Sequence, residues 1–248
     1  EREFFWRGNS FLESSRLWVI VPAAGRGIRF SDSIAKQFCR LSGASVAQHC
    51  LTRLLKLPSI ERLIIPCNPN DPGWSDVDAC KEPHVELIEG GEERANSVLN
   101  GLKTLSFVAD DMDWILVHDI VRPCVTIGSI IKLIESVREH SVGGILTTVV
   151  ADTVKLVSSD GIIIRTKNRD CLRLAQTPQI FRFGELHSAL MAASEHSFSP
   201  PDEASALEWF GRPVLFTDGR SDNIKITHPE DLALAEAIIN SQERLECG

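Results

Sequence analysis

Short apolar segments alternate with amphipathic segments along most of this chain, and this alternation restricts the fold more than any other feature. The apolar runs have the length of buried strands and lie at residues 18–21, 63–66, 85–88, 114–117 and 144–150. Such an alternation predicts an α/β domain whose parallel sheet is covered by helices on both faces. Ligands of such sheets bind at the carboxyl ends of the strands.

The helices between and after these strands are expected from apolar side chains at helical spacing. We expect them over residues 45–57, 98–105, 127–140, 184–195 and 202–210. A last helix begins near Thr227. There, Thr227 and Glu230 can form a capping box, or His228 can cap the helix with Pro229 at its first position.

The first strand runs into Pro22-Ala23-Ala24-Gly25-Arg26-Gly27, a turn with almost no side-chain bulk. Small residues let backbone N–H groups approach an anion closely, and Arg26, Arg29 and Lys36 add positive charge. The dinucleotide fingerprint is excluded because Phe30 occupies its third glycine position. The P-loop is excluded because no glycine precedes Lys36. An ordinary glycine-rich turn between strand and helix is the alternative.

Composition narrows the class of protein. The 248 residues are 43% hydrophobic with a net charge of −8, which argues against a general nucleic-acid binder. The longest apolar runs are too short to span a bilayer, so no membrane partner is expected. Seven cysteines without a C-x-x-C pair indicate buried thiols in a reducing compartment rather than disulfides or a zinc site.

The segment TVKLVSSDGIIIRTK, residues 153–167, interrupts the alternation. It has two β-rich runs around Asp160-Gly161, which predicts an inserted β-hairpin. The apolar side chains of Val157, Ile162 and Ile164 need a surface to cover them. Either the hairpin is an arm that grips a second subunit or it folds back on its own domain.

Three further motifs can carry chemistry. HDIVRP, residues 118–123, puts Asp119 and Arg122 at a strand end, where they can bind a ribose hydroxyl and a phosphate or form a structural ion pair. GGEERANSV, residues 90–98, places polar groups at a helix start, suited to a base or phosphate. Lys225 is expected on a short strand, where it either faces solvent or contacts a substrate.

Taken in order, these motifs resemble the 2-C-methyl-D-erythritol 4-phosphate cytidylyltransferase family. The resemblance runs from about residue 17 to 243 and rests on VPAAGRGIRF, KQ, GGEERANSVLNGL, VHDIVRP, ADTVK, TPQIF, DEASALE and DNIKIT followed by PEDLALAE. It implies a Rossmann-like nucleotidyltransferase sheet covered by helices, with an inserted β-hairpin arm. It also implies a homodimer with interlocked arms, and the reaction of CTP with methylerythritol phosphate to give CDP-methylerythritol and pyrophosphate, in non-mevalonate isoprenoid biosynthesis.

The resemblance also implies roles for individual residues. Arg29 and Lys36 match the cations that stabilise the transition state, and Arg169 and Lys225 match those that position the attacking phosphate. The CTP site is implied at Pro22, Ala23, Ala24, Gly25, Gly27, Glu92, Arg94, Ser97 and Asp119. Sugar-phosphate contacts are implied at Asp119, Arg122, Thr153, Arg169, Thr177 and Lys225, with Thr153 and Arg169 reaching across from the partner's arm. Mg²⁺ is implied as the cofactor, held mainly by the CTP phosphates.

Three departures from the family pattern leave these cations in place, so we expect activity to be retained. Ala35 replaces the usual proline before Lys36, Ile120-Val121 replaces a small pair, and Pro201 replaces a threonine. The alternative activity is that of a pentitol (ribitol) 5-phosphate cytidylyltransferase, against which DEASALE argues. A catalytically inactive nucleotide sensor or scaffold would be expected to lack Arg29, Lys36 or Lys225.

The resemblance and the composition together set the expected organisation of the chain. We expect an N-terminal extension over 1–16, a single domain over 17–243 with its arm at about 151–170, and a tail over 244–248. The extension has no continuous apolar stretch like that of a signal peptide. The expected location is a bacterial cytoplasm or a plastid stroma.

Overall fold

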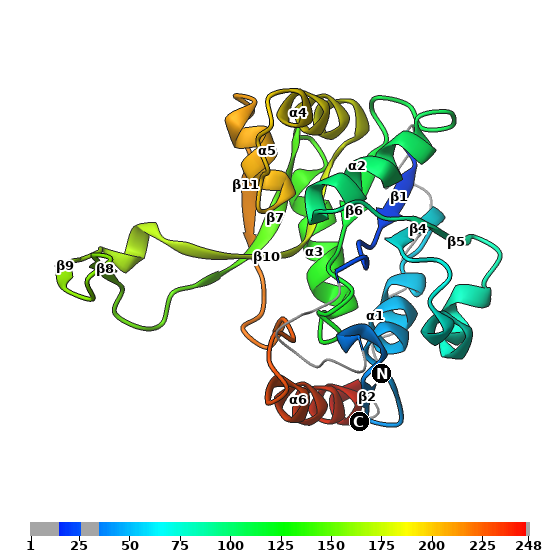
Figure 1. Ribbon diagram of the computed structural model, residues 1–248, viewed down its shortest axis with the longest axis horizontal. Coiled ribbons are helices and arrows are strands. Elements are labelled where there is room, and N and C mark those ends of the chain that lie inside the picture. Colours follow the sequence, from blue (N-terminus) through cyan, green and yellow to red (C-terminus); the bar gives the residue numbers. More distant parts are fainter. Residues whose placement is uncertain (1–14, 26–34, 247–248) are drawn as a thin grey trace.

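A seven-stranded sheet forms the centre of the computed structural model, which describes residues 15–25 and 35–246 (Figure 1). The strand order is β11-β7-β10-β6-β1-β4-β5. These strands are β1 (Leu17–Ile20), β4 (Ile60–Cys67), β5 (Val85–Glu89), β6 (Trp114–Val117), β7 (Gly143–Val149), β10 (Arg173–Arg182) and β11 (Leu215–Asp218). Strand β10 runs antiparallel to β6 and β7, and the other neighbouring strands pair in parallel.

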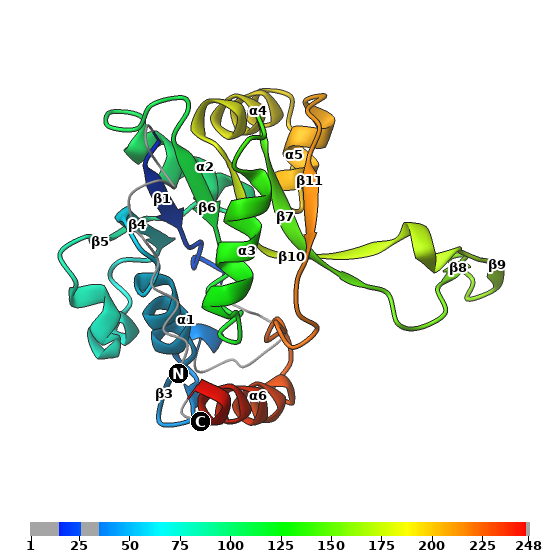
Figure 2. The same ribbon diagram turned by 180° about the vertical axis from the view of Figure 1, so that it is seen from behind.

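Helices cover both faces of the sheet, as comparison of Figures 1 and 2 shows. One apolar cluster joins the sheet to α1 (Val46–Leu55), α3 (Ile127–Val137) and α6 (Asp231–Glu246). The other joins it to α2 (Arg94–Leu105), α4 (Phe183–Glu195) and α5 (Glu203–Trp209). The side chains of β1 alternate between the two clusters, with Val19 in the first and Ile20 in the second, both fully buried. The central strands are apolar on both faces because helices cover both.

The predicted α/β class is confirmed, but the sheet is not wholly parallel as expected. The strand that breaks the pattern, β10, was not predicted. Its sequence contains Pro178, which is unusual inside a strand, together with the buried amides of Gln176 and Gln179. Strand β11 was also missed, because it is only four residues long and ends in Asp218.

The predicted hairpin is present. It consists of β8 (Lys155–Val157) and β9 (Ile163–Thr166), paired antiparallel around a turn that contains Gly161 at a φ of 79°. A positive φ of this size favours glycine. The hairpin extends away from the body of the domain, beyond the ends of β7 and β10 (Figure 1).

Short elements complete the fold. They are the β2–β3 pair (Arg40–Leu41 and Ala44–Ser45) and four 3₁₀ helices: η1 (Lys36–Phe38), η2 (Pro72–Asp76), η3 (Asp78–Lys81) and η4 (Arg169–Cys171). In the described part of the chain, none of the helices has the length and apolar character that a membrane crossing requires.

Helix α6 begins close to the predicted position but with a different cap. The Asp231 carboxylate, not that of Glu230, accepts hydrogen bonds from the backbone N–H groups of Thr227 and His228, at 2.7 and 2.8 Å. The predicted box between Thr227 and Glu230 is therefore wrong. The second alternative, a turn that starts at His228 with Pro229 next, is the closer one.

Candidate functional site

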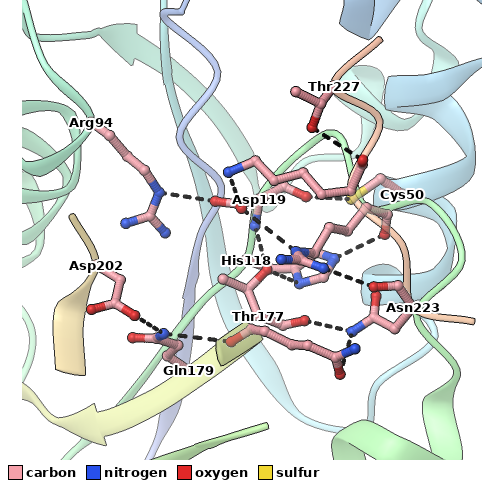
Figure 3. Close-up of polar contacts among 12 residues, drawn as sticks. Cys50, Arg94, His118, Asp119, Thr177, Gln179, Asp202, Asn223 and Thr227 are labelled. Atoms are coloured by element: carbon pink, nitrogen blue, oxygen red, sulfur yellow. Dashed lines mark hydrogen bonds and ion pairs between the residues drawn. The ribbon is translucent and has the colours of Figure 1, made fainter. Parts of the chain in front are cut away.

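Asp119, two residues beyond the end of β6, is the centre of a charged cluster (Figure 3). Its Oδ1 lies 2.9 Å from Nε of Arg94, and its Oδ2 lies 2.9 Å from Nζ of Lys225. Nε of Arg122 is 3.7 Å from Oδ2. Three cations from three different segments therefore share one carboxylate at the carboxyl end of the central strands, the place where ligands of such sheets bind.

A second carboxylate lies behind this cluster. Glu203, the first residue of α5, holds Arg94 with both of its oxygens, at 2.6 and 3.0 Å. The Glu203 side chain is 1% exposed, and that of Arg94 is 25% exposed. The bidentate geometry fixes the plane of the guanidinium group, whose Nε then points to Asp119.

The strand end is held by a buried hydrogen-bond chain. Oγ1 of Thr177 accepts a hydrogen bond from the backbone N–H of Asp119 at 3.0 Å and lies 3.0 Å from Nδ1 of His118. Nε2 of His118 is 3.1 Å from the carbonyl oxygen of Arg122. This network fits a neutral imidazole that is protonated at Nε2. Burial lowers the pKa of His118 to about 4, so the ring stays neutral near pH 7.

The segment that carries Lys225 is extended but is not a strand, so that part of the prediction is wrong. Side-chain bonds replace strand pairing. Nδ2 of Asn223 donates to the carbonyl oxygen of Thr177 at 2.8 Å, and the Arg122 guanidinium donates to the carbonyl oxygen of Asn223 at 2.7 Å. The backbone N–H of Ile226 donates to Val121. These contacts place Lys225 opposite Asp119.

Burial and charge act against each other on the ionisable groups of the cluster. Burial alone would raise the pKa of Asp119, but Arg94 and Lys225 outweigh it and hold this pKa far below its ordinary value. Burial alone would lower the pKa of Arg94, but Glu203 and Asp119 raise it instead. Burial raises the pKa of Glu203, and Arg94 opposes this only in part. Counted at their formal charges, the two carboxylates and the three cations of the cluster sum to +1.

The glycine-rich loop after β1 contacts the turn between β5 and α2. Ala23 continues the pairing with β4 through a 2.8 Å hydrogen bond to the carbonyl oxygen of Pro66. A Cβ atom on Gly90 would lie 2.4 Å from Cβ of Ala24, so only glycine permits this approach. Oγ of Ser97 accepts the backbone N–H of Gly91 at 3.0 Å. The two motifs predicted to bind the nucleotide are therefore neighbours.

The structure brings together five of the predicted site residues: Arg94, Asp119, Arg122, Thr177 and Lys225. The loop residues Pro22, Ala23, Ala24 and Gly25 follow β1. Glu92 is exposed just before α2, and Ser97 within that helix is buried. Lys36 begins η1, and its charge adds to the backbone N–H groups of His228 and Thr227 in lowering the pKa of Asp231. Gly27 and Arg29 lie outside the described residues.

Two predicted residues lie apart from the cluster. Thr153 and Arg169 flank the hairpin and are exposed, and the hairpin extends away from the body of the domain (Figure 1). The Arg169 guanidinium bonds the carbonyl oxygen of Ala151, at the base of the same hairpin. Within one chain, these two side chains are not part of the charged cluster.

Sequence reasoning gave no role to Glu203 or Gln179. Glu203 is part of the DEASALE motif, but an acidic residue at a helix start is also an ordinary partner of the helix dipole. Its pairing with Arg94 joins positions 109 residues apart. The local sequence does not show that the first turn of this helix is buried, and that burial is what distinguishes Glu203 from an ordinary acidic residue at a helix start.

A profile of the family described as IspD, 2-C-methyl-D-erythritol 4-phosphate cytidylyltransferase, matches residues 17–241. The chain belongs to this family. A relative of the same name from Hahella chejuensis is 44% identical over 92% of this chain and 95% of its own length. One from Acinetobacter baumannii is 42% identical, with the same coverage of both chains.

Solved structures of the cytidylyltransferase family share the fold. The Francisella tularensis 2-C-methyl-D-erythritol 4-phosphate cytidylyltransferase has a TM-score of 0.77 at 35% identity, covering 90% of this chain and all of its own. A 4-diphosphocytidyl-2C-methyl-D-erythritol synthase has a TM-score of 0.78 at 32% identity, covering 91% of this chain and 99% of its own. The predicted family and nucleotidyltransferase fold are confirmed.

Proposed function

We propose that this protein transfers a CMP group from CTP to 2-C-methyl-D-erythritol 4-phosphate and releases pyrophosphate, a step of isoprenoid precursor synthesis. A phosphate oxygen of the acceptor attacks the α-phosphorus of CTP, and the bond to pyrophosphate breaks. Because the nucleophile is already an anion, the protein has to position it and stabilise charge rather than supply a strong base. The observation that carries this proposal is the convergence of three cations on Asp119 beside the glycine-rich loop, in a chain of this family.

Lys225 and Arg122 are the groups that we assign to the acceptor phosphate. The Lys225 side chain is 42% exposed, so its ammonium group can contact an incoming dianion. Arg122 is 12% exposed and is held by the Asn223 carbonyl oxygen, which leaves its fork pre-oriented. Arg29 and Lys36 are assigned to the negative charge that grows on the α-phosphate and pyrophosphate, as the resemblance implies.

The nucleotide is assigned to the loop after β1 and to the turn before α2. Pro22, Ala23, Ala24, Gly25 and Gly27 would offer backbone N–H groups and little bulk, and Glu92, Arg94, Ser97 and Asp119 would border the base and ribose. Thr177 is assigned to the sugar phosphate only through the backbone it fixes at Asp119, since its hydroxyl already contacts Asp119 and His118.

Mg²⁺ is proposed as the metal, bound mainly by phosphate oxygens of CTP. Among the described residues, no three metal-ligating side chains cluster together. Both oxygens of Asp119 and both of Glu203 are already paired with cations. Neither of these two carboxylates is therefore without a cation partner. When bound, Mg²⁺ would neutralise charge on the triphosphate.

A homodimer through the hairpins is proposed from the exposed apolar surface of β8, β9 and the strands that lead to them. Ile162, Ile163 and Ile164 are 59–65% exposed, and Val149 and Leu174 are similarly exposed at the base. Large apolar side chains exposed to this extent are typical of an interface. A partner's hairpin would bring its Thr153 and Arg169 to the Asp119 cluster. Mixing Arg169→Ala with Lys36→Ala chains should then restore part of the activity in a verified heterodimer.

The activity itself is tested by a pyrophosphate-release assay that crosses CTP, UTP and ATP with methylerythritol 4-phosphate and ribitol 5-phosphate. We expect turnover with CTP and methylerythritol phosphate, and strong preference for both. Preference for ribitol phosphate would establish the alternative activity, and absence of turnover with every pair would contradict cytidylyl transfer. Because the named relatives are bacterial, a bacterial cytoplasm is the proposed location.

A further inference from the structure

Glu203 is a buried carboxylate that no substrate can reach directly. It is 1% exposed, and both of its oxygens are engaged by the Arg94 guanidinium. Leaving such a charge in the interior is costly unless it is paired. A contact of this kind either ties two helices together or sets the position of the group that it holds.

The backbone on both sides of Glu203 is fixed to the sheet. Gln179 of β10 is 1% exposed. Its Nε2 donates to Oδ2 of Asp202 at 2.9 Å, and its Oε1 accepts the backbone N–H of Ala204 at 2.9 Å. Asp202 also caps α5 by accepting the N–H of Ser205 at 2.9 Å. Glu203 therefore has little freedom to follow Arg94, so Arg94 is positioned by Glu203.

A continuous chain of contacts leads from Glu203 to the exposed end of the cluster (Figure 3 shows its Arg94–Asp119 link). The terminal nitrogens of Arg94 donate to Glu203, and its Nε donates to Oδ1 of Asp119 at 2.9 Å. The other oxygen of Asp119, Oδ2, then faces Lys225 at 2.9 Å, with Nε of Arg122 farther away at 3.7 Å. The orientation of Arg94 decides which oxygen of Asp119 is available to Lys225.

We propose that Glu203 is a positioning residue for the acceptor phosphate: by fixing Arg94 it holds Asp119 in the orientation that presents Lys225. This inference rests on the proposed function for the identity of the acceptor. With a neutral side chain at position 203, Asp119 becomes the nearest anion of Arg94. Arg94 then competes with Lys225 for both oxygens of Asp119, and Lys225 is displaced from its position.

The decisive variant is Glu203→Gln, which keeps the shape and removes the charge. The matched control is Glu208→Gln on the exposed side of the same helix. Steady-state kinetics would vary CTP and methylerythritol phosphate separately. We expect Glu203→Gln to lower kcat/KM for the acceptor by about 10- to 100-fold, the cost of a misplaced reacting group. The KM for CTP should rise by a smaller factor, because Arg94 and Asp119 also border the proposed nucleotide site. Glu203→Asp should recover part of the loss.

A double-mutant cycle with Asp119→Asn separates positioning from a purely structural tie. If Glu203 acts through Asp119, the double variant Glu203→Gln/Asp119→Asn loses no more acceptor kcat/KM than Asp119→Asn alone. Additive losses would overturn the inference, as would kinetics of Glu203→Gln equal to those of Glu208→Gln. An equal rise in both KM values would also overturn it. If Glu203→Gln does not fold by circular dichroism, the same criteria apply to Glu203→Asp.

The inference and the proposed function fail in different ways. Each variant is compared with the wild type, using whichever acceptor phosphate the wild type turns over. A wild type that prefers another acceptor contradicts the proposed substrate. The ratio of kcat/KM between Glu203→Gln and the wild type can still be measured with that acceptor. A wild type with the proposed preference and an insensitive Glu203→Gln variant contradicts only the inference.

Discussion

Strand β6 has a buried carboxylate near each end, and the two are held in different ways. Asp113, just before the strand, accepts backbone N–H groups of Arg16 and Asp110 at 2.8 and 3.0 Å. It also accepts Nε1 of Trp18 and Nε of Arg16, both at 3.0 Å. Three of these four donors belong to the backbone or to a buried indole, so these three cannot leave without unfolding the segment.

Asp119, beyond the other end of the strand, binds side chains of another kind. Among the described residues, the ion-pair partners of the Asp119 carboxylate are Arg94, Arg122 and Lys225, all of them long cationic side chains. Lys225 is partly exposed and can exchange its contact with Asp119 for one with a substrate phosphate. Similar burial and the same residue type therefore serve different purposes. Asp113 is held mainly by fixed neutral donors, with Arg16 as its one cationic partner among those named, which makes it structural. Exchangeable cations make Asp119 part of a site.

The largest effect on turnover is expected from Asp119→Asn. Removing the common anion of three cations should lower kcat/KM by roughly 10²–10³, the usual cost of losing one element of a preorganised charged site. The cations that hold the pKa of Asp119 low also stabilise its ionised form in the folded protein, so the variant should be less stable as well. The loss of turnover should persist at temperatures where circular dichroism shows a folded protein. Normal turnover in the folded variant would make Asp119 structural, like Asp113.

Asp113→Asn should show the opposite pattern. An amide cannot accept all four donors, so one or more buried N–H groups lose their partners. We expect unfolding free energy to fall by about 2–4 kcal/mol in urea titrations. Turnover of the folded variant should stay within about 2-fold of the wild type, because the charged cluster lies at the other end of the strand. A stable variant with impaired turnover would reverse the comparison.

A smaller effect is expected from pH. Burial would raise the pKa of Asp113, but the N–H groups of Arg16 and Asp110 and the Trp18 indole hold it below its ordinary 3.8. A carboxyl group whose folded-state pKa is lowered stabilises the fold above its unfolded-state pKa and stops doing so as pH falls through the folded-state value. The stability difference between wild type and Asp113→Asn should therefore be constant from pH 7 to about pH 5 and shrink below about pH 4. A difference that grows on acidification would contradict this explanation.

The two carboxylates also show what the sequence can predict. Asp119 was predicted as a site residue because HDIVRP follows an apolar strand and resembles a family motif. Asp113 has no such signal, since its partners Arg16 and Trp18 are 97 and 95 residues away. Local patterns predicted the strand–helix alternation. The hydrogen-bond and ion-pair partners of each buried carboxylate come from residues far apart in the sequence, which local patterns do not reveal.

Long-range pairing, which local patterns do not reveal, also explains the errors in the predicted fold. Strand β10 was missed because its central position comes from pairing with β6 and β7, not from its own polar, proline-containing sequence. Lys225 was placed on a strand because Ile224 and Ile226 alternate with it. The structure holds this segment through Asn223, whose amide bonds the Thr177 carbonyl oxygen. A single asparagine gives no periodic signal.

If the cluster around Asp119 uses Lys225 to hold the acceptor phosphate, removing the charge of Lys225 should impair use of the sugar phosphate and leave CTP binding nearly unchanged. Lys225→Gln keeps most of the side-chain length and loses the charge, and each substrate would be varied separately. We expect the KM for CTP to change less than about 3-fold, and kcat/KM for methylerythritol 4-phosphate to fall about 100-fold with a lower kcat. An unchanged kcat/KM for the sugar phosphate would contradict the claim and make Lys225 a surface partner of Asp119.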